Sequence, residues 1–239
     1  MSKQTRRSWL LVPASKPELI ARAARSGADA IVLDLAEFVV DGDRHAARKN
    51  MQAAMQTVRA GGAEVFAQVD PAALHADLHA CVWPGLVGVV VTRAESVAQI
   101  KEAATVLSRL ENERGLASDT LQIIPALETA RGNHAAFEIG RASPRVSALT
   151  LGRADLIMDL RAEPSDEIHL MPYLMQRLII IAGAAGVTPL GAWWRAPDRG
   201  LFATAENTYA AGQRGRAIGF KGALCLCDHQ VAPLNRAYG

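Results

Sequence analysis

Two acidic residues in the sequence occupy positions suited to binding a divalent cation. Glu128 ends one short apolar run, and Asp155 follows the next one. Carboxylate oxygens with few histidines nearby suit a hard cation such as Mg²⁺ or Mn²⁺, which takes its other ligands from water and substrate. A second interpretation is equally consistent with the spacing, in which Asp155 caps a helix and Glu128 forms an ion pair with Arg131 or Arg153.

Other polar side chains follow apolar runs in the same way, and most of them are charged. If three or more carboxylates faced one opening, they would raise one another's pKa unless a cation lay among them. The pattern therefore predicts a metal ion or an arginine at that opening. The further candidates are Asp34, Glu37, Gln68, Asp70, Arg93, Glu95, Arg153, Arg195, Asp198, Asp228 and His229.

The elements that would position these residues alternate along the chain. Short β-branched runs are separated by longer alanine-rich segments of helical period, which is typical of parallel strands joined by helices. Eight such pairs in 239 residues predict an α/β fold, a (β/α)₈ TIM barrel formed by one domain over residues 1–239. The predicted strands are Trp9–Pro13, Ala30–Leu35, Glu64–Val69, Gly88–Thr92, Gln122–Leu127, Ala148–Gly152, Pro189–Trp193 and Ala223–Leu226.

A doubly wound open sheet is the alternative architecture. Such a sheet usually carries a glycine-rich phosphate loop after its first strand, and Pro13-Ala14-Ser15-Lys16 is not one. In a barrel, functional groups lie at the carboxyl ends of the strands, which is where the polar candidates fall. At the first helix, Ser15-Lys16-Pro17-Glu18 predicts a capping box, and Gly27 a left-handed residue after the helix end.

Composition excludes several classes of function. The formal net charge is +2, without the basic excess that binding to a nucleic acid backbone requires. The apolar run Trp9–Val12 is too short for a signal peptide or a membrane span, so we expect a cytoplasmic protein. Three cysteines are too few for a disulfide framework. His75 and His79 share a helix face without an evident third ligand, and His229 is a minor candidate for proton transfer.

Motifs in chain order carry a resemblance to a known family. The segments are Arg7–Pro17, Gly27–Leu35, Leu127-Glu128-Thr129 with Gly132, Leu151-Gly152 with Asp155, Gly219–Cys225, Gln230-Val231 and Asn235. Together they resemble the citrate lyase β-subunit-like branch of the HpcH/HpaI aldolase/citrate lyase family. The resemblance implies a phosphoenolpyruvate/pyruvate-domain-like TIM barrel. Because the sequence ends soon after the eighth strand, we expect it to have no carboxy-terminal lid domain.

The resemblance also implies an activity. Members of this branch are Mg²⁺-dependent carbon–carbon lyases that act on hydroxy acids, usually as thioesters such as citryl-, malyl- or citramalyl-coenzyme A. Glu128 and Asp155 match the metal ligands. The backbone amides of Ala154 and Asp155 would lie at a helix start and receive the substrate carboxylate. We therefore expect Mg²⁺ or Mn²⁺ as cofactor and a small hydroxy or keto acid, free or as a thioester, as substrate.

This chain departs from the family pattern at the substrate site. An Arg-Val-Asn motif on the third strand reads Gln68-Val69-Asp70 here, so the charged clamp for a substrate carboxylate is missing. Arg93 or Arg153 would have to replace it. We assign Gln68, Arg93, Ala154 and Asp155 to substrate binding, and Glu37 and Arg153 to catalysis. Asp-Leu-Glu-Asp reads Asp34-Leu35-Ala36-Glu37, and Ile-His-Pro reads Leu226-Cys227-Asp228.

Two other functions remain open at this point. One is an aldolase acting on free 2-keto acids, which would share the metal site and need no thioester groove. The other is a degenerate barrel that binds a ligand without catalysis, which the lost arginine favours and the intact metal ligands oppose. In each case we expect a homo-oligomer, a trimer or a multiple of one. Nucleic acid and membranes are not expected as partners.

Overall fold

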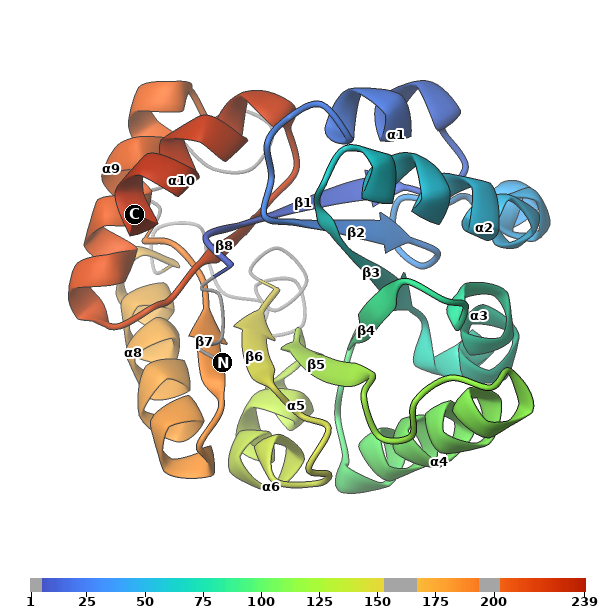
Figure 1. The fold of residues 1–239 in the computed structure, drawn as a ribbon. Helices are drawn as coiled ribbons and strands as arrows, with labels where there is room; N and C mark the ends of the chain where they lie inside the picture. Colours follow the sequence, from blue (N-terminus) through green and yellow to red (C-terminus); the bar gives the residue numbers. More distant parts are fainter. Residues whose placement is uncertain (1–5, 153–166, 194–202) are drawn as a thin grey trace.

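The computed structural model describes residues 6–152, 167–193 and 203–239, with the side chains of 167–170 left aside. Eight strands, each parallel to its neighbours, stand in the middle of the molecule, and the helices surround them (Figure 1). The strands match the predicted ones closely, and the largest difference is that β7 ends at Leu190 rather than Trp193. They are β1 (Ser8–Pro13), β2 (Ala30–Asp34), β3 (Glu64–Val69), β4 (Leu86–Val91), β5 (Gln122–Leu127), β6 (Ala148–Leu151), β7 (Thr188–Leu190) and β8 (Ala223–Cys225).

The strand order closes the sheet on itself. The order is β7-β6-β5-β4-β3-β2-β1-β8, so the first strand lies between the second and the last. Two backbone hydrogen bonds join the ends of the series: the Gly191 N–H donates to the Gly222 carbonyl at 2.7 Å, and the Lys221 N–H donates to the Pro189 carbonyl at 3.1 Å. The (β/α)₈ barrel is thus confirmed, and the open doubly wound sheet was the wrong alternative.

Helices cover the outside of the barrel, and most connections run from a strand through a helix to the next strand (Figure 1). The helices are α1 (Pro17–Ala23), α2 (Arg44–Ala60), α3 (Leu74–Cys81), α4 (Val97–Glu113), α5 (Ala130–His134), α6 (Ala136–Gly140), α8 (Glu167–Ala185), α9 (Ala205–Ile218) and α10 (Val231–Tyr238), with 3₁₀ turns η1 (Asp41–Asp43), η2 (Pro71–Ala73) and η4 (Asp228–Gln230).

The strands bury both of their faces, as their continuous apolar runs predicted. One set of side chains, which includes Val32, Phe66, Val90 and Ile124, fills the barrel interior. The alternate residues pack outward against the helices in a larger cluster. Because side chains alternate along a strand, the residues two and four positions beyond Phe66 continue the inward face toward the carboxyl end.

The capping box predicted at Ser15 is wrong. Helix α1 begins at Pro17 with Lys16 as its N-cap, and no side chain caps it. A proline fits the first helical position because it has no N–H to leave unpaired, and this places Glu18 one position too early for a capping box. A capping box instead opens α4, where Ser96 and Gln99 bond each other's backbone. Gly27 has φ +75, the left-handed conformation expected of it.

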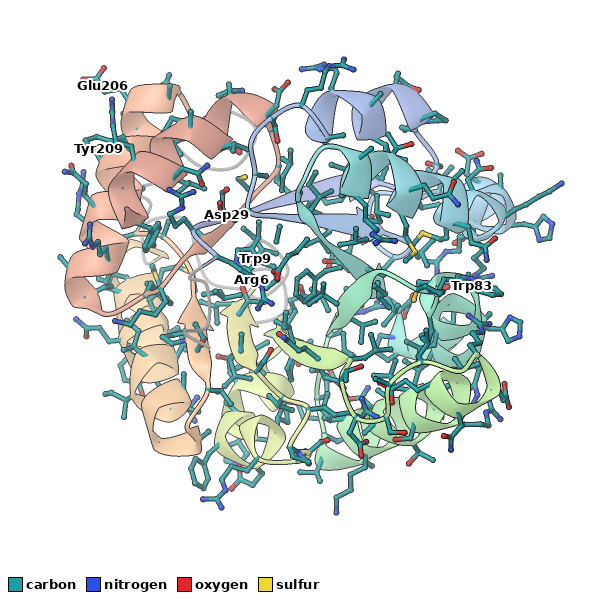
Figure 2. The ribbon with its side chains drawn as sticks, in the orientation of Figure 1. Arg6, Trp9, Asp29, Trp83, Glu206 and Tyr209 are labelled. Carbon is teal, nitrogen blue, oxygen red and sulfur yellow. The ribbon has the colours of Figure 1, made fainter. Side chains whose placement is uncertain are left out.

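The amino-terminal end of the barrel is closed by side chains. The Arg6 guanidinium lies 5.5 Å from the Trp9 ring centroid and 5.0 Å from that of Phe66, near the middle of the view in Figure 2. Arg7 forms a bidentate ion pair with Asp29 at 2.8 Å. Arg7 therefore faces away from the strands' carboxyl ends. An open site must lie at the other end of the barrel.

None of the helices in the described part of the chain is long and apolar enough to cross a membrane. The three cysteines are unbridged, and Cys81 and Cys225 are buried.

Candidate active site at the carboxyl ends of the strands

Glu128 lies at the barrel opening, directly after β5. Its side chain is only 5% exposed. Its Oε2 atom accepts a hydrogen bond of 2.7 Å from the backbone N–H of Arg93, which follows β4. Arg93 has φ +43, a left-handed conformation that is unusual for a residue with a side chain and is often found at functional sites. The loop after β4 thus fixes the carboxylate of Glu128.

The next helix begins at once beside this carboxylate. Thr129 is the N-cap of α5, and its hydroxyl accepts a 3.0 Å hydrogen bond from the Gly132 N–H. A Cβ atom at Gly132 would lie 2.3 Å from the carbonyl oxygen of Ala94, so only glycine fits there. The spacing of Glu128, Thr129 and Gly132 therefore reflects close packing of the β5 loop against the β4 loop.

Gly152, directly after β6, also contacts Glu128. A Cβ atom at this position would lie 2.1 Å from Glu128 Cγ and 2.7 Å from its Oε1 atom. Strands β5 and β6 pair with Leu127 opposite Leu151, which brings Glu128 and Gly152 to the same level of the rim. The glycine leaves the space that the glutamate side chain occupies.

From the predicted role of Glu128 as a metal ligand, we expect Gly152→Ala to weaken Mg²⁺ binding by about 10- to 100-fold, because the added methyl group forces the Glu128 side chain to move. Calorimetric titration of Mg²⁺ measures the change. Gly183→Ala is the matched control, since Gly183 is exposed on α8 with open space around its Cβ position, and it should leave Mg²⁺ affinity unchanged. Equal affinities for Gly152→Ala and wild type would contradict this role of Gly152.

Arg153, Ala154 and Asp155 lie outside the described residues, as do Arg195 and Asp198. Their predicted roles stay predictions. Within the described ranges, no group of three or more histidine, cysteine, aspartate or glutamate side chains is arranged to hold a metal ion. A cation at this opening would therefore draw on Glu128 together with a ligand from the segment after Gly152 or from the substrate.

Asp34 ends β2 and is fully buried at the same end of the barrel. Burial raises the pKa of its carboxyl group, and hydrogen bonds from three backbone N–H groups oppose that shift without cancelling it. These donors are the N–H groups of Ala36, Glu37 and Phe38, at 2.6–3.1 Å. Asp34 thus holds the β2 loop in shape. Glu37 itself is exposed on that loop, and its assignment to catalysis stays a prediction.

Gln68 lies beside Asp34, on the inward face of β3. The two residues are register partners, and the Gln68 amide favours the charged form of the Asp34 carboxyl group. Gln68 is 2% exposed, and its Nε2 atom makes no hydrogen bond of normal geometry in the part of the chain that the structure describes. A buried donor left in this state costs about 1–3 kcal/mol, so an acceptor is expected to approach it.

Asp70 accepts hydrogen bonds from two arginines at the rim. Its Oδ1 atom accepts a 2.9 Å hydrogen bond from Arg93 Nη2, and its Oδ2 atom accepts one of 3.3 Å from Arg44 Nη1. Burial raises the pKa of Asp70, but the Ala72 N–H and the two guanidinium groups outweigh it, so the pKa is lowered overall. Arg44, at the start of α2, was missed by the sequence analysis. The only sequence feature that pointed to Arg44 was a cationic side chain shortly after the β2 loop.

Glu95, on the β4 loop, pairs with Arg131 at 3.6 Å, so Arg131 has Glu95 as its partner. The other predicted partner of Glu128, Arg153, lies outside the described residues. His75 lies on α3 and pairs with Glu102 at the exposed surface.

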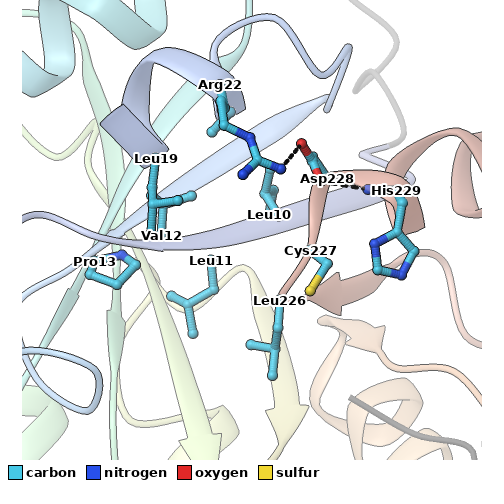
Figure 3. Close-up of a pocket in the computed structure, with 11 residues that line it drawn as sticks. Leu10, Leu11, Val12, Pro13, Leu19, Arg22, Leu226, Cys227, Asp228 and His229 are labelled. Atoms are coloured by element: carbon cyan, nitrogen blue, oxygen red, sulfur yellow. Dashed lines mark hydrogen bonds and ion pairs between the residues drawn. The ribbon is translucent and has the colours of Figure 1, made fainter. Parts of the chain in front are cut away.

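A hollow lies between β1, α1 and the end of β8 (Figure 3). It has a volume of about 320 Å³ and is lined mostly by apolar side chains, including Leu11, Leu19 and Leu226. An ion pair of 2.7 Å between Arg22 and Asp228 stands at its edge, beside His229 (Figure 3). Because Pro13 and Leu226 lie at carboxyl ends of strands, this hollow opens at the same end of the barrel as Glu128.

Known proteins resemble this chain over most of its length. A model of the HpcH/HpaI aldolase/citrate lyase family matches residues 7–227. The chain is 31% identical over 244 residues to a citrate lyase subunit beta-like protein of Deinococcus radiodurans, covering 98% of this chain and 80% of that protein. It is 25% identical over 235 residues to a (3S)-malyl-CoA thioesterase of Cereibacter sphaeroides, covering 97% and 76%.

A solved structure shows the same fold. The citrate lyase beta subunit from M. tuberculosis, complexed with oxaloacetate and magnesium, superposes with a TM-score of 0.74 at 24% sequence identity. The match covers 97% of this chain and 96% of that one.

Proposed function

The chain belongs to the HpcH/HpaI aldolase/citrate lyase family, and from this premise we propose that it is a Mg²⁺-dependent lyase. It cleaves or forms a carbon–carbon bond beside a hydroxyl group in a small carboxylic acid or its coenzyme A thioester. The observation that carries the proposal is the buried carboxylate of Glu128 at the barrel opening. The Arg93 N–H donates a hydrogen bond to it, and Gly152, which has no side chain, leaves room for it.

The donor set fits a hard cation. Glu128 offers carboxylate oxygens, and we assign Asp155, three residues beyond Gly152, as the second protein ligand. One or two carboxylates completed by substrate oxygens are the usual protein site for Mg²⁺. When bound, the cation would polarise the carbonyl oxygen of the keto acid product and stabilise the negative charge that develops there.

The chain's own residues orient the substrate in this proposal. The backbone amides of Ala154 and Asp155 receive the carboxylate of the keto acid fragment, as donors at a helix start do. Gln68 and Arg93 contact the rest of the substrate, and Arg153 and Glu37 serve catalysis. The closed amino-terminal end of the barrel, with Arg6 stacked near Trp9, restricts entry to the carboxyl end.

A thioester substrate is favoured over a free keto acid by one further observation. The apolar hollow between β1, α1 and β8 opens on the same end of the barrel and offers a place for the chain of a carrier such as coenzyme A. The similarity to a (3S)-malyl-CoA thioesterase supports this choice. Turnover of free keto acids without any thioester would instead identify a free-acid aldolase.

The test is calorimetric titration of Mg²⁺, with and without oxaloacetate or pyruvate, on wild type and Asp155→Ala. We expect the keto acid to tighten Mg²⁺ binding in wild type and Asp155→Ala to abolish it. A panel of citryl-, malyl- and citramalyl-coenzyme A then identifies the substrate. Absence of heat with either ligand in wild type would overturn the proposal and favour a barrel that binds ligands without catalysis.

A further inference from the structure

Gln68 is a buried polar residue at the barrel opening, and its side-chain amide lies beside the Asp34 carboxyl group. It is 2% exposed, and its Nε2 atom makes no hydrogen bond of normal geometry within the described residues. It follows Phe66 on the inward face of β3, so the amide lies within the opening and not against the helices. A ligand in the opening would meet this donor.

The charges around Gln68 determine which kind of ligand oxygen its side-chain N–H can bind. Its register partner Asp34 is a fully buried carboxyl group whose pKa is already raised by burial. A ligand carboxylate placed between them would bring a second negative charge close to the first, in surroundings with little water. Two carboxylates in one site oppose each other's ionisation unless a cation separates them.

Two described arginines at this rim bond the side chain of Asp70. Arg93 and Arg44 both bond the carboxylate of Asp70, whose side chain is buried and whose lowered pKa keeps it charged. The guanidinium groups are therefore held at the level of Asp70, two residues farther along the chain than Gln68. Since a strand rises about 3.3 Å per residue, this is roughly 6–7 Å farther toward the rim.

We propose that Gln68 binds an uncharged oxygen of the substrate, the carbonyl of an amide or a thioester or a hydroxyl group, and that the site disfavours a carboxylate there. The inference rests on the proposed function, because it specifies the substrate at that same site. The substrate class is thus a 2-keto acid fragment whose second functional group is neutral, not a dicarboxylic acid of the oxaloacetate type.

Two ligands of equal size separate the alternatives. Oxaloacetate carries a second carboxylate, and 2-oxosuccinamate carries an amide in its place. Titrated calorimetrically into the Mg²⁺-loaded wild type, the amide should bind at least about tenfold more tightly, because it keeps the hydrogen bond to Gln68 and avoids the repulsion from Asp34. Gln68→Met, which keeps the side-chain length and removes the donor, should reduce the preference for the amide to the part that repulsion from Asp34 supplies.

Gln68→Arg should reverse the preference and favour oxaloacetate by about tenfold or more, as a charge-assisted hydrogen bond would. Gln176→Arg adds the same charge on the exposed face of α8 and should change nothing. If Gln68→Arg does not fold, the Gln68→Met comparison still decides the point. Tighter binding of oxaloacetate than of the amide by wild type overturns this inference alone, whereas absence of Mg²⁺-linked binding of any keto acid overturns the proposed function with it.

Discussion

Glu128→Gln should abolish measurable Mg²⁺ binding and lower kcat/KM for the thioester substrate by about a thousand-fold or more. A bound cation contributes several kcal/mol to stabilising the developing charge, and each 1.36 kcal/mol is a factor of ten in rate. The glutamine keeps an oxygen that can accept the Arg93 N–H, so the loops should keep their shape. Calorimetry of Mg²⁺ and turnover of the thioester panel measure the two effects.

Glu95→Gln is the matched control for this variant. Glu95 lies on the neighbouring loop, is only partly buried and pairs with Arg131 at 3.6 Å. Glu95→Gln removes the same charge from the same end of the barrel. Because solvent screens the ion pair between Glu95 and Arg131, Mg²⁺ affinity and turnover should stay within about twofold of wild type. A Glu128→Gln protein with wild-type turnover would exclude Glu128 as a metal ligand.

The fold could be predicted because each element carried its own local signal. The interior of the barrel needs strands that are apolar on both faces, and runs such as Gln122–Leu127 show this directly in the sequence. Gly27 was predictable as a break, since its φ of +75 suits glycine best. The positions of Glu128, Gln68 and Asp34 followed from the rule that barrel sites lie at strand ends.

The contacts within the site could not be predicted in the same way. Arg93 reaches Glu128 through its backbone N–H, which depends on a left-handed conformation that no residue type indicates. Arg44 meets Asp70 only because α2 and the β3 end are brought together in the fold. The predicted capping box at Ser15 was wrong for the opposite reason, since a local motif was outcompeted by Pro17 at the first helical position.

The ion pair between Arg145 and Glu111, at the amino-terminal end of β5 and β6, could not be predicted from the sequence either. Arg145 and Glu111 are 3% and 1% exposed, and they form a bidentate pair at 3.0 and 2.5 Å. Arg145 also donates to Ser108 Oγ and the Leu121 carbonyl. Its own carbonyl accepts from the Ile123 N–H, so the pair fixes the start of the strands that end at Glu128 and Gly152.

Arg145→Met should lower the free energy of unfolding by about 3–5 kcal/mol, because it leaves the buried Glu111 carboxylate without its cation. In wild type, burial raises the pKa of Glu111, but the Arg145 bonds and two backbone N–H groups outweigh it and lower the pKa overall. The stabilisation is therefore present above the unfolded-state pKa and is lost as the pH falls through the lower folded-state pKa. Urea unfolding at several pH values measures the free energy.

In Arg145→Met the pH dependence of stability should weaken. Without the cation, only the two backbone N–H groups oppose burial, so the pKa of Glu111 is higher than in wild type and the deficit of the variant relative to wild type should shrink in acid. Arg109→Met removes an exposed arginine from the same helix, 3.7 Å from Glu113, and should cost less than about 0.5 kcal/mol at any pH. A deficit in Arg145→Met below 1 kcal/mol, or one independent of pH, would contradict a role for this pair in anchoring β5 and β6.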